Sequence, residues 1–85
     1  MADPSARRFA EYLSQERRAA ALYTALARLT DGSRADALNE LAAIEDRHAA
    51  HWEERLRQAG AQVPAPDPHL DPDSATILAR ARALS

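Results

Sequence analysis

Apolar residues recur every three or four positions along two segments of the chain, about residues 4–30 and about residues 33–59. This spacing places them on one side of an α-helix, so the pattern predicts two amphipathic helices. The stripe residues are Phe9, Leu13, Ala20, Tyr23 and Ala27 in the first segment and Leu38, Leu41, Ala42, Ala49, Trp52 and Leu56 in the second. A short connection between them predicts an antiparallel helical hairpin.

Residues that favour helix ends stand at the boundaries of these segments. Asp3 followed by Pro4 fits the start of the first helix. Gly32 fits the left-handed residue that ends this helix. Ser33 with Asp36 three positions later resembles a capping box, which would start the second helix.

The pattern changes after Gly60, which we expect to close the second helix. Residues 61–72 hold four of the five prolines, and proline cannot continue a helix. We interpret this stretch as a linker. A short helix over residues 74–84 follows, with Asp71 or Asp73 as its cap.

The composition favours an all-α chain that gains stability by self-association. There are 21 Ala and 10 Leu but few β-branched apolar residues, so strands are disfavoured. Alanine leaves little core volume, and a chain without cysteine has neither disulfides nor thiolate metal sites. We divide the chain into a hairpin over residues 1–60 and a linker with a short helix over residues 61–85. Two hairpins are expected to form a four-helix bundle as a homodimer.

The charge balance narrows the class of partner. Eleven basic residues, all Arg, oppose 13 acidic ones, for a net charge of −2 without a basic block. This distribution does not indicate a nucleic-acid partner. No apolar run approaches the ~20 residues that span a bilayer, and the chain does not start like a signal peptide. We expect a cytoplasmic chain that does not insert into a membrane by itself.

Three polar residues interrupt the apolar stripes. Glu16 lies in the middle of the first stripe, and Glu45 and His48 lie one turn apart in the second. Burying these groups among Ala and Leu is costly unless a cation compensates, and the wheel predicts no inward Arg. We therefore interpret the three residues as metal ligands. Carboxylate and imidazole together suit Fe, Mn or Zn.

The same residues predict a centre shared between two chains. Di-iron carboxylate bundles use one Glu from each of two helices and a Glu-x-x-His motif from each of the other two. This chain carries half of that set, Glu16 and the motif from Glu45 to His48. A symmetric dimer would supply four Glu and two His, enough for two ions, so dimerisation and site formation become one hypothesis.

Between Tyr12 and Gly60 the chain also carries a family resemblance. The matching residues are Glu16, Ala21-Leu22-Tyr23, Leu41 to His48 and Trp52 to Leu56. They resemble the rubrerythrin-type ferritin-like domain of bacterial vacuolar-iron-transporter-like proteins and, more loosely, the encapsulated ferritins. The resemblance implies a ferroxidase that oxidises Fe(II) to Fe(III) with dioxygen, with Glu16, Glu45 and His48 as ligands and catalytic residues and Tyr23 beside them. It also implies a homodimer or an oligomer of dimers, and it makes the membrane portion of an iron transporter a candidate partner.

Other interpretations of the same residues stay open. The chain could be an iron-sensing or iron-delivery module of a membrane iron transporter without turnover, or a structural dimerisation hairpin. Tyr23 fits either a core aromatic residue or a hydrogen-bond donor to a ligating carboxylate. Trp52 fits a packing role, and His51 fits a boundary or dimer contact, with an auxiliary metal site as the alternative.

Overall fold

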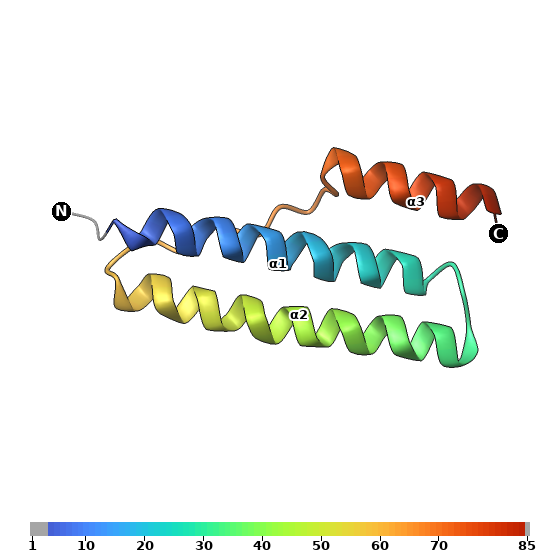
Figure 1. The fold of residues 1–85 in the computed structure, drawn as a ribbon, viewed down its shortest axis with the longest axis horizontal. Helices are drawn as coiled ribbons and strands as arrows, with labels where there is room; N and C mark the ends of the chain where they lie inside the picture. The colour runs from blue at the N-terminus through green and yellow to red at the C-terminus, as the bar shows by residue number, and fades with distance from the viewer. Residues whose placement is uncertain (1–3, 85) are drawn as a thin grey trace.

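The computed structural model describes residues 4–84, and every regular element in that range is a helix. The helices are α1 (Ser5–Ala27), α2 (Gly32–Gln58) and α3 (Pro72–Leu84) (Figure 1). The predicted all-α class and the packing of two long helices against each other are confirmed. α3 packs on α1, on the side away from α2 (Figure 1). The cap predicted at Asp3 lies outside the described residues.

The contact between α1 and α2 follows a seven-residue spacing. The buried residues are Leu13, Ala20 and Ala27 on α1 and Ala42, Ala49 and Leu56 on α2. Seven residues are close to two helical turns, so each set forms one line along its helix. We call these two facing lines the seam. Alanine in the seam allows the helices to approach closely, while Leu13 and Leu56, each 1% exposed, fill its end.

The first helix ends earlier than predicted. We expected it to continue to about Thr30, but α1 ends at Ala27. The N–H of Leu29 donates to the carbonyl of Leu26 at 3.0 Å, which tightens the chain into a turn there. Gly32 has the expected positive φ of 59°, but it is the first residue of α2 and not the residue that closes α1.

The capping box predicted at Ser33 and Asp36 is wrong. Asp31 is the residue before α2, in an extended conformation, and no side chain forms a capping hydrogen bond there. Because α2 already includes Gly32, Ser33 lies inside the first turn and cannot be the cap.

The end of α2 agrees with the prediction. Gly60 has a φ of 74°, and its N–H donates to the carbonyl of Arg57 at 3.0 Å. The N–H of Ala61 donates to the carbonyl of Leu56 at 3.0 Å. These two bonds form a Schellman motif, which satisfies carbonyls that the end of the helix leaves free. The linker then crosses the end of the hairpin, where Val63 packs near the buried leucines.

Of the two caps considered for the last helix, the structure has Asp71. Its Oδ2 atom accepts a hydrogen bond from the N–H of Ser74 at 3.1 Å, and Pro72 is the first helical residue. Hydrogen bonds from the side chain and backbone of Ser74 hold the pKa of Asp71 below 3.8. Ser74 and Leu78 are the buried residues of α3, whereas Ile77 is 47% exposed. No helix within residues 4–84 has the length and apolarity needed to cross a bilayer.

Candidate metal centre

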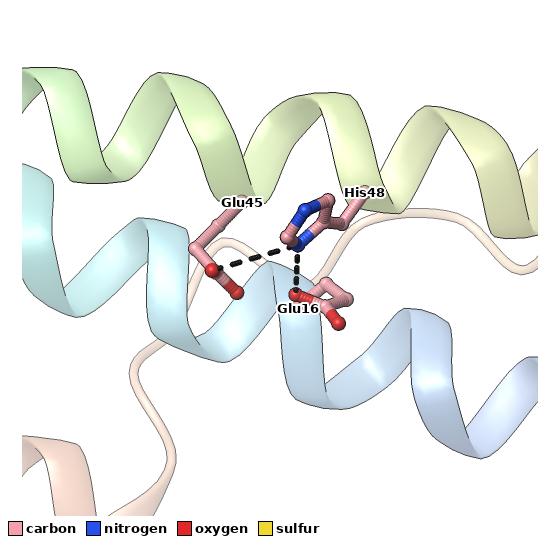
Figure 2. Close-up of side chains that lie close together, drawn as sticks. All are labelled: Glu16, Glu45 and His48. Carbon is pink, nitrogen blue, oxygen red and sulfur yellow. Dashed lines mark ion pairs between the residues drawn. The ribbon is translucent and has the colours of Figure 1, made fainter.

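Glu16, Glu45 and His48 converge on one side of the seam (Figure 2). Glu16 comes from α1, and the other two come from α2. The Nδ1 atom of His48 lies 3.4 Å from Oε2 of Glu16 and 3.7 Å from Oε1 of Glu45. One ligand atom from each residue lies within 4.8 Å of the other two. The structure therefore brings together the three residues that the sequence selected.

The seam explains why both carboxylates point toward each other. Glu16 and Glu45 each lie three residues after one seam residue and four residues before the next. Both are therefore next to the buried line, and their side chains are 23% and 22% exposed. His48 precedes a seam residue by one position, about 100° around the helix, and its side chain is 55% exposed. We had predicted that His48 lies inside the apolar stripe, but the structure places it at the rim of the hairpin.

The surroundings of Glu45 raise the pKa of its carboxyl group. A hydrogen bond with Glu16 raises the pKa of Glu45 above 4.5, and burial and the charge of Glu16 raise it further. The charge of His48 acts in the opposite direction. The ion pairs of both glutamates are with His48. A divalent cation placed between these groups would cancel the repulsion between the carboxylates.

Aromatic rings border the cluster along the same side of the hairpin. Trp52, one turn beyond His48, lies 5.6 Å from the ring of Phe9 and 4.7 Å from the ring of Tyr12. These contacts confirm the packing role predicted for Trp52. The exposed ring of His51 meets the edge of Trp52 at 4.8 Å. We call this side of the seam, with the three ligand candidates and the rings, the site side.

Tyr23 is the fourth residue that the sequence assigned to the site. It is half-buried on α1, two turns after Glu16, and it forms no hydrogen bond with Glu16, Glu45 or His48. Its assignment as a donor to a ligating carboxylate stays a prediction.

The opposite side of the seam holds a charge pair that the sequence reasoning missed. Arg17, predicted to point away from the partner helix, is 23% exposed, and its Nη2 atom lies 3.8 Å from Oε2 of Glu53. Its Nη1 atom donates to the carbonyl of Pro64 in the linker at 2.8 Å. We call this side the linker side. The sequence did contain a signal for this pair, which is that Arg17 directly follows Glu16. Consecutive residues lie about 100° apart around a helix, so if Glu16 lies on one side of the seam, Arg17 lies on the other.

Comparisons with known proteins leave the family open. The chain matches no protein-family model, and neither the curated proteins nor the solved structures gave a match. The ferritin-like assignment therefore depends on the residues themselves and enters below as a proposal.

Proposed function

We propose that this chain is a ferritin-like iron-binding protein that dimerises through the site side and oxidises Fe(II) to Fe(III) with dioxygen at a shared centre. The observation that supports it is the convergence of Glu16, Glu45 and His48 from two helices, with ligand atoms within 4.8 Å of one another. A like-charged pair beside an apolar seam costs stability unless a cation compensates it.

The distances fit a single bound ion. Two ligand atoms that each lie about 2.0–2.2 Å from an ion are at most about 4.4 Å apart. The imidazole nitrogen is 3.4 Å from Glu16 and 3.7 Å from Glu45, inside that limit, whereas the 4.8 Å span of the three ligand atoms exceeds it by about 0.4 Å, so the carboxylates would have to move slightly closer on binding. The geometry supports Nδ1 as the ligating atom of His48, since this atom faces both carboxylates. Mn²⁺ and Zn²⁺ accept the same donors and are expected to bind as substitutes.

The exposure of the site side supports a partner hairpin. His48 is 55% exposed and Leu41 is 42% exposed, although the sequence pattern predicts that both face the core. A second hairpin packed on this side would cover both and complete a four-helix bundle. It would also bring a second Glu, Glu and His set to the same place, so that two ions share four carboxylates and two imidazoles.

In the proposed reaction iron is the substrate. Two ferrous ions give one electron each to dioxygen, which takes up two protons and leaves as hydrogen peroxide. Glu16 and Glu45 supply negative charge, which stabilises Fe(III) relative to Fe(II). His48 binds as the neutral imidazole, so acid should displace the metal.

Anaerobic loading with Fe²⁺ tests the site. We would measure mass by light scattering and iron by elemental analysis on the same chromatographic peak. About one iron per chain in a dimer or its multiple is expected for the wild type and for Glu40→Ala, an exposed control on α2. Glu45→Ala should lose the iron. A metal-free peak, or an iron content that Glu45→Ala leaves unchanged, would contradict the proposal.

Oxygen consumption then separates turnover from binding. With excess Fe²⁺ in air, a ferroxidase consumes iron over many cycles, whereas a sensing or delivery module consumes only the amount that it binds. Stoichiometric consumption by a protein that does bind iron would contradict the catalytic part of the proposal and favour the delivery module.

A further inference from the structure

The connection between α1 and α2 contains the dipeptide Asp31-Gly32. Asp31 is exposed, and its backbone is extended, with a φ of −141° and a ψ of −179°. Its side chain forms no capping hydrogen bond, and within residues 4–84 its carboxylate takes part in no other hydrogen bond or ion pair. The carboxyl group can therefore turn toward the backbone of the next residue.

The backbone nitrogen of Gly32 is also without a partner. Gly32 is the first residue of α2, so its N–H is one of those that a helix leaves without an intrahelical acceptor. It donates no hydrogen bond to any backbone carbonyl within residues 4–84. Apart from its chain neighbours and its own helix, no atom lies within 4 Å of the place where a β-carbon on Gly32 would be. An open, unpaired amide thus directly follows an unpaired carboxyl group.

We propose that Asp31 is a site of spontaneous isoaspartate formation. The nitrogen of Gly32 attacks Cγ of Asp31, a bond between these two atoms forms, and the carboxyl oxygen leaves with the amide proton as one molecule of water. The product is a five-membered succinimide ring. Water then opens the ring at either of its two carbonyl carbons. Opening at the main-chain carbonyl gives isoaspartate, in which the chain continues through Cβ and Cγ of residue 31.

The fold and the sequence together protect most of the other aspartates. Asp36 and Asp46 lie inside α2, where the N–H of the following residue is held by the helix. Asp67 and Asp71 are each followed by proline, which has no N–H to lose. None of these four residues has the unpaired amide that follows Asp31.

Asp73 is the informative comparison, because the small residue Ser74 follows it. The N–H of Ser74 donates to Oδ2 of Asp71 at 3.1 Å, and Ser74 is 6% exposed. Only the fold therefore protects Asp73, and unfolding should remove this protection.

The modification changes the main chain where it connects α1 and α2. Isoaspartate adds one carbon atom to the path of the backbone, leaves the mass unchanged and presents the former main-chain carboxyl group as a side chain. That carboxylate is the group that protein isoaspartyl methyltransferases modify, with S-adenosylmethionine as the methyl donor. Asp31 precedes Glu45 by 14 residues, about 21 Å along α2, so the inference does not depend on the proposed metal centre.

Prolonged incubation of the full chain at neutral pH and physiological temperature tests the proposal. Peptide mapping with electron-transfer dissociation locates isoaspartate, and labelling by an isoaspartyl methyltransferase measures its amount. The wild type should accumulate isoaspartate at residue 31. Asp31→Glu should lose this signal, because the longer side chain would have to close a six-membered ring. Asp36→Glu, the matched control on α2, should keep it.

A parallel incubation in urea shows what the fold contributes. Isoaspartate at Asp73 should appear in urea but not in the folded chain, since unfolding releases the N–H of Ser74. Absence of isoaspartate from residue 31 of the folded protein would overturn the proposal, whether or not urea restores it. Equal amounts at Asp31 and Asp73 in the folded chain would also overturn it, because the fold would then not select the site.

Discussion

The two sides of the hairpin seam place a carboxylate of α2 beside α1 in opposite electrostatic settings. On the linker side, Glu53 meets Arg17 at 3.8 Å, and the same guanidinium binds the linker at Pro64. On the site side, Glu45 meets another carboxylate, Glu16, and an exposed imidazole. On the linker side, the charge of Glu53 is therefore compensated within one chain. Within residues 4–84, no Arg forms an ion pair with Glu16 or Glu45, and this difference marks the site side as the candidate functional surface.

Glu16 and Arg17 are adjacent in the sequence, yet one belongs to the candidate metal centre and the other to the charge pair on the linker side. They are neighbours on α1, and the seam passes between them, so one turns to each side. A burial pattern alone would treat both as tolerated charges near a helix contact. The partner that each one meets on α2 decides whether the charge stabilises the fold or costs stability.

The largest change in the free energy of unfolding is expected from a substitution in the buried seam, which lies between the two sides. Leu56→Ala should lower the free energy of unfolding by about 2–5 kcal/mol, because this 1% exposed side chain would leave a cavity. Glu40→Ala is the control, since this residue is exposed on α2 and its loss should change stability by about 0.5 kcal/mol or less. Urea unfolding of the metal-free protein at one fixed concentration measures both. Equal losses would mean that the seam is not the main source of stability.

The second prediction compares how two carboxylates of α2, Glu45 and Glu53, affect the affinity for Fe²⁺. Glu45→Ala should weaken Fe²⁺ binding more than about 100-fold, because loss of a direct ligand exceeds the effect of losing an outer partner. Glu53→Ala, the matched variant on the linker side, should leave affinity unchanged. Trp52 is the single tryptophan and packs one turn from His48, so anaerobic Fe²⁺ quenching of its fluorescence reports binding. Similar affinities in both variants would place the metal elsewhere.

The third prediction uses the raised pKa of Glu45 in the metal-free protein. A raised pKa in the folded state means that the contribution to stability is fully present below the unfolded value of about 4.5 and is lost as pH rises through the folded value. The wild type should therefore lose stability relative to Glu45→Gln as pH rises through that window. Urea unfolding at several pH values with a chelator measures the difference. A wild type that instead gains stability relative to Glu45→Gln as pH rises would show that Glu45 has a favourable partner as an anion.

The smallest effect is expected on the linker side. Arg17→Ala should lower the free energy of unfolding by about 1 kcal/mol or less, because its partners are partly solvated. Hydrogen exchange of the linker, residues 61–71, should nevertheless become faster, since the bond to Pro64 is lost. Arg8→Ala, an exposed control on α1, should change neither. Faster exchange in both variants would mean that Arg17 does not hold the linker.

Periodicity was sufficient for the hairpin and for the choice of the three ligand candidates. A period near 3.6 and the scarcity of β-branched residues predict two helices, and both depend on interactions within a few residues. Glu16 stood out because it occupies a stripe position where an apolar residue is expected. The close of α2 at Gly60 was equally local, since a positive φ of 74° favours glycine.

Features that depend on distant segments were not predictable in this way. The helical wheel gives an angle around one helix, but it does not show which flank another segment covers. Arg17 was placed outward because the path of the linker was unknown, and the exposure of His48 depends on its offset from the seam. Ile77 was grouped with Leu78 because a 13-residue helix offers several apolar directions, of which α1 covers one.

The sequence by itself determined the helices, the stripe on each and the polar residues that break the stripes, because these follow from backbone geometry and side-chain chemistry within a few turns. Only the tertiary structure decided that Glu16 meets Glu45 and His48 while Arg17 meets Glu53. The physical reason is the register of two antiparallel helices, which the close fit of the alanines and of Leu13 and Leu56 in the seam fixes over the whole length of the hairpin.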